Sequence, residues 1–278
     1  MSDEGLKVDS ESEDQSRFRA RLSGWIRSER AHFEEAQQAA TGRFGAFEAG
    51  LLITGAVGLT VMTFLGNPMT YLQLFEPDRF SAHWLEWGEL TLLLHWISCC
   101  VIGYALIPMI YLLWWRRSLG DYYLSFRGFG RHLPLYLLLL TPVSLLVLWV
   151  SHWPDFQQIY PFYTLAGRSW RDLLIWELAY GLQFVALEFF FRSFLLEGLR
   201  PAIGYGAIWI MIVPYCCIHF QKTAAESLGS IVAGVVLGWM ALRTRSIWGG
   251  VLAHWLIAVE MDVASLFQRG NWPPGGLP

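Results

Sequence analysis

The stretch VALEFFFRSFLLEGLR, from Val185 to Arg200, is almost continuously apolar, yet it carries Glu188 and Arg192 four residues apart. Residues at this spacing lie on the same face of a helix, so the carboxylate and the guanidinium can meet. Ionisable groups are costly in hydrocarbon, and where they occur they usually face the interior of a helix bundle and mark a site. The spacing alone leaves two interpretations open, a functional pair and a purely structural ion pair between helices.

The composition around this stretch is that of an integral membrane protein. The chain is 54% hydrophobic and only 15% charged, whereas soluble domains are roughly 25% charged. Blocks of about 20 apolar residues are long enough to span a bilayer as helices. We therefore predict an all-α, polytopic membrane helix bundle with about seven transmembrane helices, at about 46–65, 90–115, 133–153, 172–199, 201–220, 226–243 and 246–268. The net charge of −3 gives no indication of a nucleic-acid partner.

The first 45 residues differ from the rest. They begin with the acidic MSDEGLKVDSESEDQ, which we expect to be disordered, and continue with a helical pattern that either lies along the membrane surface or is solvated. If the N-terminus is inside, 15 of the 20 Lys and Arg fall on the inner side and 5 on the outer side, which favours N-in by the positive-inside rule. We thus expect a cytoplasmic tail with a juxtamembrane helix at 1–45 and a transmembrane bundle at 46–270.

Ionisable and polar residues within the spans concentrate in the C-terminal half. They are Glu177, Gln183, Glu188, Arg192, His219, Glu226, His254, Glu260 and Asp262. A buried carboxylate beside an arginine can act as a general base, and nearby histidines can hold a water or an oxyanion. Glu188, His219 and His254 could alternatively hold zinc as three protein ligands with an open position. The HExxH pattern of many zinc proteases is absent.

The order and spacing of these residues resemble those of the CPBP or ABI intramembrane proteases, a family named for type II CAAX prenyl endopeptidases and for bacteriocin-processing or self-immunity proteins. LEFFFR matches its EExxxR motif through Glu188 and Arg192. YCCIH matches FxxxH with Tyr for Phe and ends at His219, and GVVLGWMALRTRS matches the helix and turn that precede the third motif, where His254 is present. The match covers about 173–262. Leu187 replaces the first glutamate, and Ala258 stands where Asn or Asp is expected.

This resemblance implies an intramembrane endopeptidase with a glutamate mechanism. Glu188 would activate a water, His219 and His254 would hold that water or stabilise the oxyanion, and Arg192 would orient Glu188. Asp262 would support the site, although eight residues of helix, about 12 Å, separate it from His254. No cofactor is required in this mechanism, whereas zinc is the alternative.

The implied partners are the lipid bilayer and a membrane-associated or lipidated peptide, such as a CAAX-type tail, a leader or a sorting tail. The implied location is the cytoplasmic (inner) membrane of a bacterium. Leu187 and Ala258 motivate an alternative, a non-catalytic immunity or scaffold protein of the same family. A further alternative is a proton-coupled transporter that uses the buried carboxylates and histidines as a relay.

Overall fold

The computed structural model describes residues 3–126, 129–272 and 274–275, and all the regular elements in these residues are helical. The helices are α1 (Asp3–Ala39), α2 (Ala46–Thr60), α3 (Pro68–Phe75), α4 (Ala82–Val101), α5 (Ile107–Trp114), α6 (Phe129–Val150), α7 (Pro154–Ile159), α8 (Trp170–Glu188), α9 (Leu196–Ile203), α10 (Gly206–Cys217), α11 (Ala224–Thr244) and α12 (Trp248–Gln268). Short π-helical segments continue α2, α4 and α8 at Val61–Leu65, Ile102–Leu106 and Phe189–Leu195. The predicted all-α fold class is confirmed.

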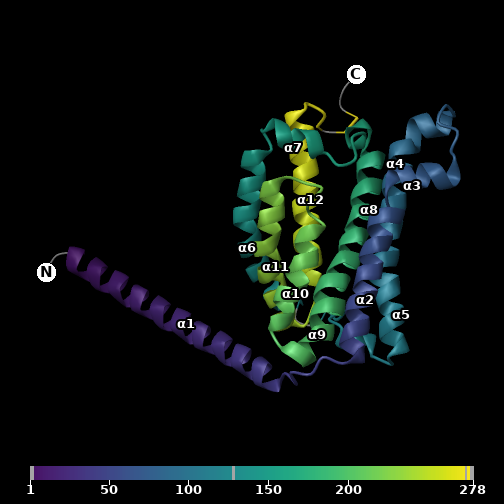
Figure 1. The fold of residues 1–278 in the computed structure, drawn as a ribbon. Coiled ribbons are helices and arrows are strands. Elements are labelled where there is room, and N and C mark those ends of the chain that lie inside the picture. Colours follow the sequence, from purple (N-terminus) through teal and green to yellow (C-terminus); the bar gives the residue numbers. More distant parts are fainter. Residues whose placement is uncertain (1–2, 127–128, 273, 276–278) are drawn as a thin grey trace.

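Six helical runs in the described residues are long and apolar enough to cross a membrane. They are Ala46–Leu65, Ala82–Trp114, Phe129–Val150, Trp170–Ile203, Ala224–Thr244 and Trp248–Gln268, and the shorter α10 is also apolar. The runs form one upright bundle, with the start of α2 and the end of α12 at opposite ends (Figure 1). The chain is an integral, multi-pass membrane protein.

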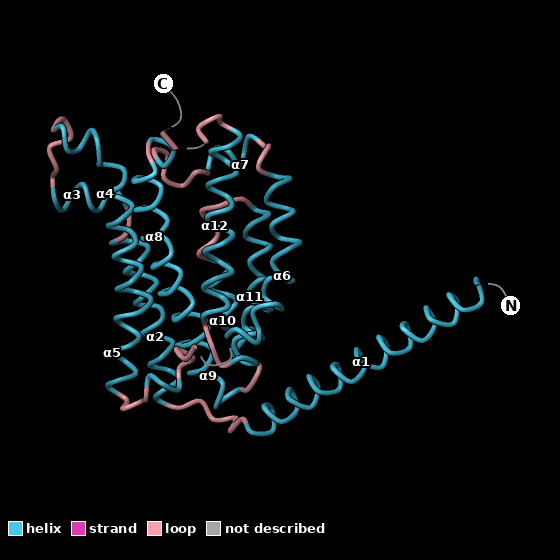
Figure 2. Tube along the Cα trace, turned by 180° about the vertical axis from the view of Figure 1, so that it is seen from behind, coloured by secondary structure: helices cyan, strands magenta, loops and turns pink. Residues whose placement is uncertain are grey.

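The run formed by α8, the π-helical segment Phe189–Leu195 and α9 is the most buried span. In the most apolar 18 residues of this run 67% of the residues are buried, whereas the corresponding share in α6 is 11%. It lies between α4 and α12 (Figures 1 and 2), and α8 contacts both. The π-helical turns begin directly after Glu188, and such bulges occur frequently at functional sites. The quoted stretch is therefore the centre of the bundle, which explains why it is apolar on all sides.

The predicted span at 201–220 is wrong in its length. Helix α10 has only 12 residues, or about 18 Å, and a bilayer core is about 30 Å thick. Pro214 lies near its end, where it removes a backbone donor. The chain then turns through His219 and returns as α11, whose N-cap Thr223 accepts from the Glu226 backbone N–H at 3.2 Å. The Ser227 hydroxyl of α11 donates to the His219 carbonyl oxygen at 2.9 Å, so α11 supplies a hydrogen bond to the backbone of the turn.

The N-terminal segment is more helical than we predicted. Helix α1 begins at Asp3, so it includes the acidic residues for which we expected disorder. It projects from one end of the bundle (Figures 1 and 2). Close to the bundle, Glu29 lies 3.1 Å from the Arg243 guanidinium and accepts from the Trp239 indole N–H at 3.1 Å. These contacts fix the second half of α1 against α11, and pairs such as Arg30–Glu34, at 2.8 Å, support the helix itself.

Candidate active site

The Glu188 and Arg192 side chains meet in the interior, as their spacing predicts. Glu188 is 1% exposed and Arg192 is 0% exposed. Glu188 Oε1 lies 3.4 Å from Arg192 Nη1. The guanidinium also lies over the Tyr215 ring at 4.2 Å. A buried charge is tolerated only when it is paired, so each of these two groups makes the burial of the other possible.

His254 of the neighbouring helix α12 contacts Glu188 of this pair. Its Nδ1 lies 3.1 Å from Glu188 Oε1 and 3.1 Å from the Gly250 carbonyl oxygen. Both neighbours are hydrogen-bond acceptors, so Nδ1 carries the proton in the neutral imidazole and Nε2 is an acceptor. The ring also stacks on Phe184, with 5.6 Å between the centroids. The two sequence-predicted residues Glu188 and His254, 66 positions apart, are therefore in direct contact.

His219 enters the same cluster through Tyr215. Tyr215 is 1% exposed, and its hydroxyl lies 2.7 Å from His254 Nε2. The Tyr215 ring packs against the His219 ring, with centroids 4.9 Å apart, and His219 Nδ1 bonds to the Tyr215 carbonyl at 2.7 Å. The short helix α10 and the turn after it therefore place both residues beside α12. The four sequence-predicted residues Glu188, Arg192, His219 and His254 belong to one cluster.

Several polar atoms in this cluster have no hydrogen-bond partner within the described residues. They are Glu188 Oε1 and the three guanidinium nitrogens of Arg192. Buried polar groups in native proteins are nearly always paired with protein or with water. A water, or a carbonyl oxygen brought in by a substrate, is the kind of group that these atoms can bind. The cluster is thus chemically suited to hold a water next to a carboxylate.

The same geometry does not fit the alternative zinc site. In the described residues there is no group of three His, Cys, Asp or Glu side chains placed to hold a metal ion. Both His254 nitrogens are engaged, Nδ1 by Gly250 and Glu188 and Nε2 by Tyr215. A zinc ligand needs a free nitrogen lone pair that points at the ion. The side chains would have to rearrange before they could bind zinc.

Asp262 lies apart from the cluster. It is 0% exposed and accepts from the Phe162 backbone N–H at 2.9 Å and from the Trp176 indole at 2.8 Å. Asp262 therefore ties the segment before α8 to α8 and α12. Glu177, the residue after Trp176, is 6% exposed, and neither of its carboxylate oxygens has a hydrogen-bond partner in the described residues.

Sequence reasoning missed two residues that shape the site. Tyr215 was noted only as a replacement for Phe, although its hydroxyl contacts His254. Gly250 was not singled out, yet a Cβ at this position would lie 2.1 Å from Glu188 Oε2. The signals were present as the Tyr four residues before His219 and as the Gly pair at 249–250. Leu187 and Ala258, the two departures from the family motifs, are buried in apolar clusters instead.

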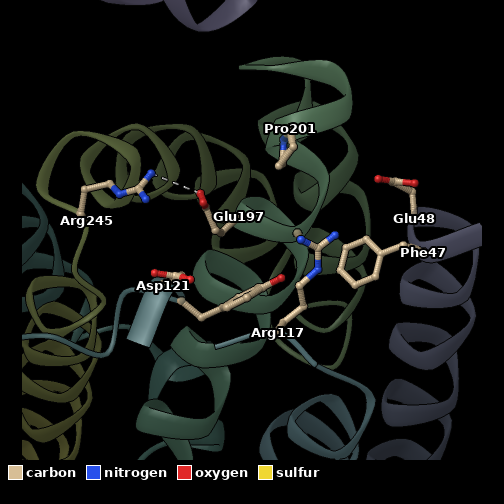
Figure 3. Close-up of a pocket in the computed structure, with 9 residues that line it drawn as sticks. Phe47, Glu48, Arg117, Asp121, Glu197, Pro201 and Arg245 are labelled. Atoms are coloured by element: carbon tan, nitrogen blue, oxygen red, sulfur yellow. Dashed lines mark ion pairs between the residues drawn. The ribbon is translucent and has the colours of Figure 1, made fainter. Parts of the chain in front are cut away.

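A cavity of about 260 Å³ lies at the end of the bundle where α2 begins. Its charged lining residues are Glu48, Arg117, Asp121, Glu197 and Arg245, and Figure 3 shows Arg245 reaching toward Glu197. Their closest atoms are 3.6 Å apart. The lining contains no histidine. This cavity is therefore separate from the cluster around Glu188 and lacks its chemistry.

One segment of the chain, which contains the cluster, is similar to a known protein family. Residues 168–259 match the family model described as "Type II CAAX prenyl endopeptidase Rce1-like". This range includes Glu188, Arg192, His219 and His254 but ends before Asp262. No curated protein and no solved structure matches the chain. The predicted resemblance is confirmed for this segment: residues 168–259 are similar to the Rce1-like type II CAAX prenyl endopeptidases.

Proposed function

We propose that this protein is an intramembrane endopeptidase that hydrolyses a peptide bond in a membrane-associated or lipidated substrate. The match of residues 168–259 supports a CAAX-type intramembrane protease at the level of the family. The observation that carries the proposal for this chain is the buried contact between Glu188 and His254, at 3.1 Å. The two residues come from different helices, and the Arg192 guanidinium lies 3.4 Å from the same carboxylate oxygen, Oε1.

In the proposed reaction Glu188 is the general base. A water bound at Glu188 gives one proton to the carboxylate, and its oxygen forms a bond to the carbonyl carbon of the scissile peptide. The tetrahedral intermediate collapses when the C–N bond breaks, and the proton on Glu188 passes to the leaving amine. The products are one carboxylic acid and one amine. His219 Nδ1 faces the Tyr215 carbonyl oxygen, so in this scheme His219 would stabilise the developing oxyanion as an imidazolium, through its Nε2–H. Such stabilisation is typically worth about 3–4 kcal/mol per donor.

The polar interior around Glu188 supports a hydrated reaction site within an apolar scaffold. The unpartnered atoms of Glu188 and Arg192 provide positions for the water. Helix α10 is shorter than a full span, and the turn that follows it carries His219, which is half-buried. Non-helical backbone at membrane depth occurs where it is buried in protein or lines a cavity. A substrate bond could therefore enter beside this turn.

A non-catalytic scaffold is the second candidate, because Leu187 and Ala258 put apolar side chains at two motif positions. The two candidates differ in their response to Glu188→Gln, which keeps the size of the side chain and removes the base. We would compare the peptide termini of membrane proteins in cells that carry either protein at matched expression. Proteolysis predicts termini that vanish in the variant and thereby identify the substrate. Identical termini with both proteins folded would favour the scaffold.

A further inference from the structure

The hydroxyl group of Tyr215 has no role in the mechanism described so far, although it lies at the centre of the cluster. It is 2.7 Å from His254 Nε2, and the Tyr215 side chain comes from α10 whereas His254 comes from α12. In the neutral imidazole the proton lies on Nδ1, which faces only acceptors, so Nε2 is the acceptor of this bond and the phenol is its donor. The Tyr215 hydroxyl, the His254 imidazole and the Glu188 carboxylate thus follow one another in space, and the last link is the 3.1 Å contact between His254 Nδ1 and Glu188 Oε1.

We propose that Tyr215 is a positioning residue of this active site. Its hydroxyl holds the His254 imidazole from the Nε2 side, so that the Nδ1–H edge stays against Glu188. This proposal rests on the proposed function, because it assigns Tyr215 a part in the same hydrolysis. It acts through His254 and not on the substrate, in the way that a buried carboxylate fixes the tautomer and orientation of a catalytic histidine in other hydrolases.

The hydroxyl can be separated experimentally from the ring that carries it. The ring has its own contacts, with Arg192 at 4.2 Å, His219 at 4.9 Å and Phe191 at 5.1 Å. A phenylalanine at position 215 would keep all three. If Tyr215 only fills space between the helices, Tyr215→Phe should therefore be silent. If the hydroxyl positions His254, the same variant should lose activity without losing the fold.

The first measurement is the hydrolysis of a farnesylated CAAX-type peptide by the purified protein in proteoliposomes. We expect Tyr215→Phe to lower kcat about tenfold, because one net hydrogen bond contributes up to ~1.5 kcal/mol, while KM stays unchanged. The matched control is Tyr104→Phe, since Tyr104 is 1% exposed in the same bundle and packs on Phe190 and Phe191 outside the cluster. We expect the control to retain the wild-type kcat.

The second measurement does not depend on activity. Diethyl pyrocarbonate reacts with the free lone pair of a neutral imidazole, and mass spectrometry can follow the reaction at each histidine. The Tyr215 hydroxyl covers His254 Nε2, so we expect His254 to react about fivefold faster in Tyr215→Phe, the factor for one hydrogen bond of about 1 kcal/mol. The exposed His83 serves as the internal reference and should react equally in both proteins.

The two measurements separate the failure of this proposal from the failure of the proposed function. A slower kcat together with faster modification of His254 supports the proposal. An unchanged rate of His254 modification overturns it, whatever the activity, and so does a wild-type kcat in Tyr215→Phe. If the wild-type protein cleaves no substrate in the proteoliposomes or in cells, the proposed function fails, and Tyr215 then has no hydrolysis to support.

Discussion

Gly250 provides the sharpest structural test of the candidate site, because its missing side chain leaves the space that the Glu188 carboxylate occupies. A Cβ at position 250 would lie 2.1 Å from Glu188 Oε2 and 2.6 Å from its Cδ, whereas ordinary contact begins at 3.4 Å. In Gly250→Ala the carboxylate must therefore move by about 1.3 Å. Displacements of about 1 Å can cost a reaction about 10²-fold, so we expect kcat/KM to fall by about two orders of magnitude.

The assay is hydrolysis of a farnesylated CAAX-type peptide in proteoliposomes, with thermal unfolding measured in parallel. Gly229→Ala on α11 is the matched control, because its Cβ would meet nothing within 4 Å. It should keep the wild-type kcat/KM, and alanine in a helix should add up to ~1 kcal/mol of stability. If Gly250→Ala remains folded and keeps kcat/KM within about threefold of wild type, a difference of only ~0.7 kcal/mol, the carboxylate is not held where we place it.

The remaining predictions concern the charges around the site. Arg192→Leu should lower the free energy of unfolding by about 3–5 kcal/mol, because it leaves the Glu188 charge buried and unpaired. Denaturant titrations of this variant and of the double variant Glu188→Leu/Arg192→Leu test that cause. It is contradicted if the double variant is no more stable than the single one. Asp262→Asn should cost about 1–3 kcal/mol of stability and leave kcat unchanged, since Asp262 bonds to Phe162 and Trp176 rather than to the cluster; a kcat loss at full stability would place it in the site. Dialysis against a chelator should leave hydrolysis unchanged, and a loss that added zinc restores would favour the metal mechanism.

The fold class and much of the cluster could be predicted because their signals are local. The length of each apolar block indicates whether it can span the membrane as a helix, and the four-residue spacing puts Glu188 and Arg192 on one helix face. His254 was singled out because a histidine in an apolar helix is unusual. None of these patterns, however, measures the distance between helices. The contact of Glu188 with His254 depends on how α8 and α12 pack, and only the structure supplies it.

The errors have physical causes that the same patterns cannot report. The apolar content of 201–220 was sufficient for a full span, but α10 ends at Cys217, and the hydrogen bond from Ser227 to the His219 carbonyl stabilises the turn that follows. Tyr215 was noted only as a replacement for Phe, because the motif does not show that its hydroxyl has a partner on α12. The role of Gly250 follows from a side chain 62 residues earlier in the chain. Each case depends on tertiary contact, which hydropathy and spacing do not encode.

The central claim is that Glu188 activates a water for peptide hydrolysis, and isotopic labelling tests it most directly. The purified wild-type protein and Glu188→Gln would each be incubated with the farnesylated peptide in water enriched in oxygen-18, and the products analysed by mass spectrometry. The account predicts a new carboxylate that carries one oxygen-18 in the wild-type reaction and no product with Glu188→Gln. A folded Glu188→Gln protein that forms labelled product at the wild-type rate would contradict it.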